Sequence, residues 1–307
     1  LNHQSARSTN HLQKELFQSD QDTRLLDVFS PQKPFSRDKL LDVCKGFTAA
    51  AVSFAVTGSS SADAAGLRDR LRQKQFDKPI FNRPPGEATY PEWLRGEWDV
   101  EQKFAGYLFP NAKIPKQKIV ADEDVPGFKQ LSIIMLPDIG DRTFNYKKRF
   151  FERDGAVVED REFNFRNQLD NFFGRPTMTK IEYMPETNPN RLSLNFNPTN
   201  KKNVQRIELF GNARDTEFVD DNIFLNSEYL RQATFYIPNL SGVVLQIIAD
   251  YQNYWYYKRS PTNPDEVEVT LLTAGYLQPQ DALFFDSPTA PVVLYSHTMT
   301  MRRVKKM

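Results

Sequence analysis

Short runs in which apolar and polar residues alternate recur along the chain from Gly96 onward, at intervals typical of antiparallel strands. The runs RIELF and VEVTLL show this alternation clearly, with one face inward and one outward. We expect strands over the segments Gly96–Tyr107, Phe128–Met135, Thr143–Glu152, Ala156–Phe165, Thr177–Met184, Arg191–Asn197, Val204–Phe210, Glu228–Ile237, Gly242–Lys258, Glu266–Ala274 and Val292–Val304.

Turn and helix signals between these runs are few. The tripeptide Arg153-Asp154-Gly155 predicts a tight hairpin, because both of its last two residues tolerate positive φ. Helical periodicity is confined to the segments Gly66–Gln75, Asn167–Phe173 and Pro279–Phe284. About ten antiparallel strands at this spacing predict an all-β sandwich or barrel.

The first sixty or so residues have a different pattern. Residues 1–36 are polar without apolar periodicity, whereas residues 47–57 read FTAAAVSFAVT and follow the basic residues Arg37, Lys39 and Lys45. The small residues Ala62 and Ala64 come next, in an A-x-A arrangement. This is the order of a signal peptide, too short to span a bilayer, with cleavage expected after Ala64 and a mature N-terminus at Ala65. The alternative is a buried amphipathic helix.

A signal-like segment behind a long polar stretch resembles the bipartite presequence of plastid proteins bound for the thylakoid lumen. We therefore divide the chain into a targeting region (1–64), an extended proline-rich lead-in (65–92) and a β domain (93–307). No later segment is long and apolar enough to anchor in lipid, so a soluble mature protein is expected. The alternative location is secreted or periplasmic.

Composition narrows the possible functions. With 40 basic and 39 acidic residues, the chain has no net field that would attract nucleic acid. The only cysteine, Cys44, lies in the targeting region, and His297 is the only histidine of the mature chain. We therefore expect no disulfide, metal site or cofactor, and we identify no catalytic residue. The acidic groups at 122–124 and 220–221 lack the spacing of a calcium loop and are interpreted as solvated turns.

Three motifs, in order, resemble the marks of the lipocalin family. They are Gly96-Glu97-Trp98 at the start of the domain, Asp250-Tyr251 with Tyr254 further on, and Arg302-Arg303 in the last strand. The resemblance implies a β-barrel in which Trp98 closes one end and Arg302 or Arg303 packs across it. Ala249 departs from the family pattern, which has Thr before the Asp-Tyr pair.

The mature segment is also similar to a family of cyanobacterial and plastid proteins that is described as a domain of unknown function. The likeness is carried by YPEWLRGEWDV, DVPGFKQLSIIMLPDIG, DREFN, SEYLRQ and VVLYSHTMTMRR. It implies a plastid location and a link to photosynthesis.

The run IIADYQNYWYY has aromatic residues on both faces if it forms one strand. Alternation groups Tyr251, Asn253, Trp255 and Tyr257 on one face and Asp250, Gln252, Tyr254 and Tyr256 on the other. We expect one face to fill the interior and the other to contact a lid, a partner or a membrane component. We identify Tyr251, Trp255 and Tyr257 as the ligand-binding residues.

Three functions follow from this pattern. The first is a binding module that holds an apolar small molecule, such as a pigment or a lipid. The alternative is a non-enzymatic assembly or stability factor for photosynthetic membrane complexes, with a filled barrel. A pigment-modifying enzyme is the least favoured, because no clear catalytic carboxylate pair is present.

Overall fold

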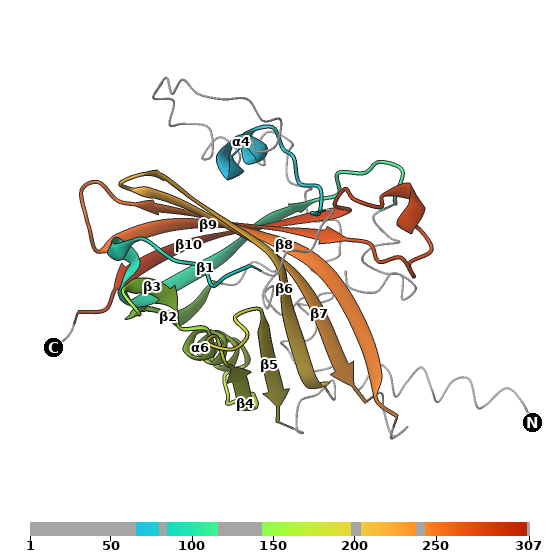
Figure 1. The fold of residues 1–307 in the computed structure, drawn as a ribbon, viewed down its shortest axis with the longest axis horizontal. Coiled ribbons are helices and arrows are strands. Elements are labelled where there is room, and N and C mark those ends of the chain that lie inside the picture. The colour runs from blue at the N-terminus through green and yellow to red at the C-terminus, as the bar shows by residue number, and fades with distance from the viewer. Residues whose placement is uncertain (1–65, 80–84, 116–142, 198–203, 238–242, 306–307) are drawn as a thin grey trace, which may run out of the picture. The chain divides into compact units, whose positions relative to one another are not determined.

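A computed structural model describes residues 66–79, 85–115, 143–197, 204–237 and 243–305, all within a unit that spans Phe35–Met307. In these residues ten strands form one antiparallel sheet, in the order β3-β2-β1-β10-β9-β8-β7-β6-β5-β4. The sheet is strongly curled into a half-barrel (Figure 1). The expected antiparallel β class of about ten strands is confirmed, and the edge strands β3 and β4 are not paired with each other.

The strands are β1 (Gly96–Leu108), β2 (Phe144–Arg153), β3 (Ala156–Glu159), β4 (Met178–Tyr183), β5 (Arg191–Phe196), β6 (Val204–Asp220), β7 (Ile223–Tyr236), β8 (Leu245–Arg259), β9 (Glu266–Tyr276) and β10 (Val293–Arg303). The described helices are α4 (Leu67–Arg72) and α6 (Arg161–Phe173), with 3-10 turns η1 (Glu92–Leu94) and η2 (Phe284–Asp286). Helix α6 lies inside the curl and α4 lies outside it (Figure 1). The two faces of the sheet are therefore covered by different parts of the chain.

The β2–β3 hairpin forms as predicted. Asp154 and Gly155 connect the strands with backbone φ angles of 52° and 77°. Residues other than Gly, Asn and Asp rarely adopt such values. Arg153 and Ala156 are the last paired residues on either side.

The strand predicted over Ala156–Phe165 is wrong in its second half. Strand β3 ends at Glu159, and α6 begins at Arg161. The carboxylate of Asp160 caps the helix by accepting the backbone N–H of Phe163 at 3.1 Å. Several polar side chains on the buried side of α6, including Asn164, hide its amphipathic pattern in the sequence.

Strands β6 and β7 are longer than predicted. Strand β6 continues to Asp220, and β7 begins at Ile223. The turn between them includes Asp221, in the Asp220-Asp221 pair that was interpreted as a solvated turn. The predicted strand Phe128–Met135 and the acidic group at 122–124 lie outside the described residues.

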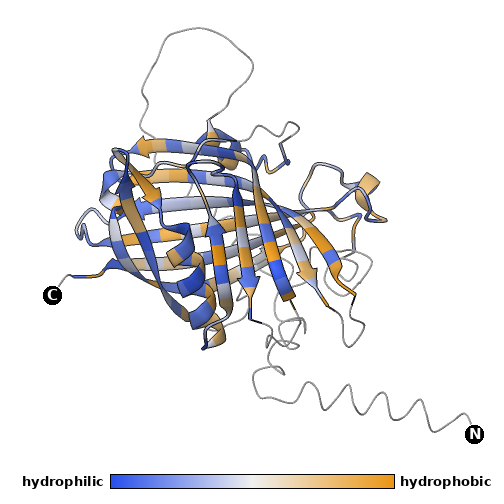
Figure 2. Cartoon of the chain, turned by 60° about the horizontal axis from the view of Figure 1, so that its bottom comes forward, coloured by the Kyte–Doolittle hydropathy of each residue, from blue (hydrophilic) through white to orange (hydrophobic). Residues whose placement is uncertain are grey.

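Hydrophobic and hydrophilic positions alternate along several strands (Figure 2). On the inner face, Trp98, Phe150, Trp255 and Tyr257 share one buried cluster, which the lead-in residue Tyr90 joins. A second inner cluster packs α6 against β4, β5 and β6. The outer face has its own cluster under α4. The predicted alternation of β8 is thus observed.

Candidate functional site

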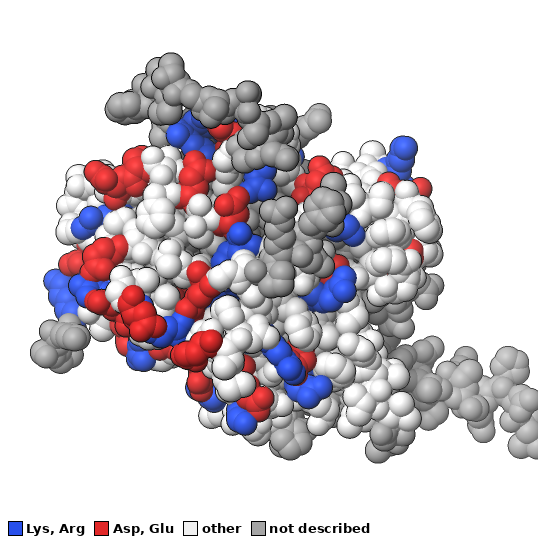
Figure 3. All heavy atoms as spheres, viewed as in Figure 1, with Lys and Arg blue, Asp and Glu red and all other residues white. Residues whose placement is uncertain are grey.

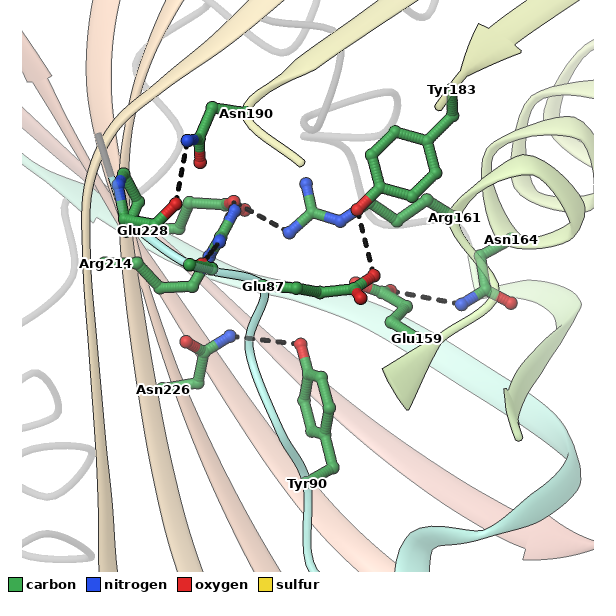
Figure 4. Close-up of polar contacts among 12 residues, drawn as sticks. Glu87, Tyr90, Glu159, Arg161, Asn164, Tyr183, Asn190, Arg214, Asn226 and Glu228 are labelled. Atoms are coloured by element: carbon green, nitrogen blue, oxygen red, sulfur yellow. Dashed lines mark hydrogen bonds and ion pairs between the residues drawn. The ribbon is translucent and has the colours of Figure 1, made fainter. Parts of the chain in front are cut away.

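Five charged side chains meet on the inner face of the sheet. This interior charge cluster consists of Lys148 (β2), Glu159 (β3), Arg161 (α6), Arg214 (β6) and Glu228 (β7). Figure 4 shows four of them, converging from opposite sides of the curl. Charged groups are seldom placed in such positions unless they are paired.

Glu228 binds two guanidinium groups at once. Arg161 Nη2 donates to Glu228 Oε1 at 2.7 Å, and Arg214 Nε donates to the same oxygen at 3.2 Å. Burial by itself would raise the pKa of Glu228, but the two cations outweigh burial and lower the pKa to about 2. The carboxylate is therefore ionised at neutral pH.

Lys148 and Glu159 form the second pair of the cluster. Their Nζ and Oε1 atoms lie 3.0 Å apart, and Asn164 Nδ2 donates to the same Oε1 at 3.1 Å. Burial opposes ionisation, yet Lys148 and Arg161 hold the pKa of Glu159 below its usual value. The Lys148 ammonium also lies 4.4 Å from the ring centroid of Trp255, a cation–π contact.

Residues 85–90 of the lead-in cross the interior between the two halves of the sheet (Figure 4). Asn190 Nδ2 donates to the carbonyl of Pro85 at 2.7 Å, and the Tyr183 hydroxyl donates to Glu87 Oε1 at 3.0 Å. The ring of Tyr90 lies 4.9 Å from that of Phe150. The end of the predicted lead-in, residues 85–90, is therefore packed into the core.

A small, mostly enclosed cavity lies beside the cluster among the described residues. Its volume is about 20 Å³, and its lining includes Lys148, Glu228, Trp255 and Tyr257. A cavity of at least about 10–15 Å³ is needed to hold one water molecule, so the space admits one or two. Within the described residues, the Tyr257 hydroxyl and Asn226 Oδ1 are buried without a hydrogen-bond partner.

The ligand-binding residues predicted from the sequence all lie on the inner face. Tyr251, Trp255 and Tyr257 are 0%, 6% and 1% exposed. Trp255 and Tyr257 line the cavity, with ring centroids 6.1 Å apart, whereas the hydroxyl of Tyr251 donates to Gln232 Oε1 at 3.4 Å. Tyr254 faces outward, as the alternation predicts.

The motif residues do not form one site. Gly96 and Trp98 meet Arg303, whose guanidinium carbon lies 4.3 Å from the Trp98 ring centroid. The sequence predicts this contact with either arginine; Arg302 instead lies 3.4 Å from Glu266, on the surface. Asp250 is on the outer face.

Asp250 has a structural setting of its own. Arg231 donates to both of its carboxylate oxygens, at 2.9 and 3.0 Å, and the hydroxyl of Tyr229 donates at 3.0 Å. Burial would raise the pKa of Asp250, but these hydrogen bonds and the nearby charge lower it.

Sequence reasoning did not identify the interior charge cluster. Alternation places Glu228 on the same strand face as Asn226 and Leu230. An inward-pointing carboxylate could therefore have been predicted from the sequence. Its partner Arg161 is 67 positions away, and nothing local links the two.

His297 is fully buried, its ring centroid 5.3 Å from that of Phe104.

The remaining predictions concern the cleavage site, a membrane-spanning segment and a metal site. The cleavage-site residues Ala62, Ala64 and Ala65 lie outside the described residues. Among those that are described, no helix has the length and apolar character needed to cross a membrane. The same part of the chain contains no group of three or more metal-ligating side chains.

Residues 83–305 match a family model described as a domain of unknown function (DUF6816). The chain belongs to this family. The match covers the inner lead-in, all ten strands and α6, so the interior charge cluster lies wholly within the DUF6816 domain. No curated protein and no solved structure matches the chain.

Proposed function

We propose that this DUF6816 domain is a non-enzymatic interaction protein, an assembly or stability factor that acts through its surface. The observation that supports this is the interior as the described residues form it, which is filled except for one small cavity. Small-molecule sites have volumes of about 300–1,000 Å³. The enclosed space beside Trp255 and Tyr257 is about 20 Å³. This space is far too small for a pigment or a lipid.

The charges of the interior agree with a stabilising role. Glu159 and Glu228 each face cations within the cluster, and both have a lowered pKa. Neither carboxyl group is therefore a ready proton donor near neutral pH, as a general acid would need to be. On the face shown in Figure 3, basic and acidic side chains are interspersed, a surface suited to a protein partner more than to a polyanion.

A small-molecule carrier is the second candidate. It is favoured by the Tyr257 hydroxyl and Asn226 Oδ1, which line the cavity without partners among the described residues. A ligand with a polar end would satisfy both groups and rest its apolar part on Trp255. The apolar pigment or lipid predicted from the sequence would leave them unsatisfied.

We further propose that the protein works in the thylakoid lumen, beside photosynthetic membrane complexes. The support is the order of the N-terminal segments and the likeness to cyanobacterial and plastid sequences. Sequencing the N-terminus of the native protein tests the location. A start at Ala65 supports it, and retention of residues 1–64 contradicts it.

Purification of the native protein from its source distinguishes the two functions. An interaction protein should co-migrate with a larger complex on native gels and should carry no stoichiometric pigment or lipid by absorbance and extraction. A carrier should have a monomeric mass and a bound molecule. A monomer without any bound molecule would contradict both proposals.

A further inference from the structure

The outer face of the sheet carries an aromatic surface that the chain covers with its own N-terminal segment. We call this surface the outer patch; its members are Leu225, Tyr229, Tyr254, Leu272, Tyr276 and Leu294. The covering segment, residues 66–78, is called the strap. Its apolar side chains Leu67, Leu71 and Phe76 are 2%, 3% and 7% exposed.

The apolar contacts of the strap follow a simple pattern. Leu67 and Leu71 are four residues apart and occupy one face of α4. Phe76 follows, with its ring edge-on to Tyr254 at a centroid distance of 5.5 Å. This is how an amphipathic helix is bound in a groove, through a few anchors on one face.

Polar contacts fix the direction of the strap. The backbone N–H of Arg68 donates to Glu217 Oε2 at 2.9 Å, and Arg70 forms an ion pair with Asp215. At the other end, the Tyr276 hydroxyl donates to the carbonyl of Phe76 at 2.7 Å. The outer patch, together with Asp215 and Glu217 of β6 beside it, therefore holds the strap at both ends as well as through its apolar side chains.

The strap and the patch differ in their relation to the family. The DUF6816 match begins at residue 83, so the strap lies outside it and the whole outer patch lies within it. The family domain thus supplies the surface, and a segment outside that domain fills it in this chain.

We propose that the outer patch is a peptide-binding site that the strap occupies within the same chain. The partner that competes for it is an amphipathic helical segment of another protein with two leucines four residues apart, an arginine between them and an aromatic residue beyond. This inference rests on the proposed interaction function and names its surface. Displacement of the strap exposes the aromatic residues to the partner.

The test uses the full chain and a synthetic peptide of residues 66–78 with a fluorescent label. The double variant Leu67→Asp/Leu71→Asp releases the strap, because it places two carboxylates against the apolar patch. Fluorescence anisotropy should show saturable binding of the peptide to this variant, at least tenfold tighter than to the wild-type chain. The matched control Gln73→Asp/Gln75→Asp adds the same charges at exposed positions and should behave like wild type.

Two results would overturn the inference. One is a released variant with wild-type circular dichroism that does not bind the peptide; the other is equal binding to wild type and variant. If the double variant does not fold, Phe76→Ala replaces it, with a smaller gain in peptide affinity expected. The assay uses only purified protein and peptide, so its result does not depend on whether a native complex is found. The peptide-binding site and the proposed interaction function can therefore fail separately.

Discussion

The guanidinium group of Arg303 lies over the indole of Trp98, 4.3 Å from its ring centroid, at the register position where β1 and β10 pair. Arg303 Nη2 also donates to the carbonyl of Trp93 at 2.8 Å, and Nε donates to Asp265 at 3.0 Å. Trp98 itself donates from Nε1 to the carbonyl of Leu94 at 2.8 Å. One arginine thus joins the last strand to the turn that precedes the first.

Replacement of Arg303 by Ala should therefore destabilise the domain by about 2 kcal/mol, because a cation–π contact and several hydrogen bonds are lost together. The neighbouring Arg302→Ala is the control; its side chain is exposed, and we expect a change within about 0.5 kcal/mol. Urea denaturation of both variants measures the difference. Equal losses in the free energy of unfolding would show that the contact of Arg303 with Trp98 does not stabilise the domain.

Gly96 should not tolerate a side chain. Its φ is +130°, and a Cβ atom would lie 2.7 Å from Nη1 of Arg303. Gly96→Ala should cost about 1–3 kcal/mol, because a strained backbone is combined with displacement of the arginine. Gly86→Ala is the matched control, since nothing lies within 4 Å of the Cβ position there. Thermal unfolding compares the two, and similar melting temperatures would contradict this account.

Glu228→Gln should destabilise the domain by about 3–5 kcal/mol, because it removes the buried carboxylate that Arg161 and Arg214 share. The exposed Glu268, 3.7 Å from Lys258, provides the control Glu268→Gln, with an expected cost of at most about 1 kcal/mol. Chemical denaturation at pH 7 gives both values. A small loss at Glu228 would show that the arginines find other partners.

The same residue predicts a pH dependence. The pKa of Glu228 falls from its usual 4.5 to about 2 in the folded protein. Its contribution to stability is therefore complete above about pH 4.5 and is lost as pH falls toward 2. Denaturation midpoints of wild type should decline across this range, and Glu228→Gln should decline less. Parallel curves for the two proteins would contradict the assignment.

Tyr257→Phe distinguishes a filled core from a ligand site. The hydroxyl of Tyr257 has no partner among the described residues, so its removal should leave stability within about 0.5 kcal/mol of wild type or raise it. Tyr229→Phe is the control, because that hydroxyl donates to Asp250, and its loss should cost about 1–2 kcal/mol. Equilibrium unfolding measures both. A clear loss of stability or of a co-purified molecule in Tyr257→Phe would favour the carrier.

Local signals in the sequence predicted much of the sheet. The turn at Asp154-Gly155 and the two faces of β8 depend on neighbouring residues, and both are observed. Helix α6 was partly missed, because its inner face contacts charged and polar groups and so lacks an apolar stripe. The pairing of Arg161 with Glu228 depends on how the curled sheet brings together segments 67 positions apart, and a local residue pattern does not contain this information.

The first strand of the sheet pairs with the last, and the lead-in lies under strands that come more than a hundred residues later: Arg214 donates to the carbonyl of Gly86, 128 positions away. Contacts of such separation require large loops to close and slow the folding of a domain. A chain that is emerging from a ribosome or a membrane channel, N-terminus first, has no finished core until β10 arrives. Loss of even the final strand should therefore prevent the whole domain from maturing and leave its early strands open to proteases.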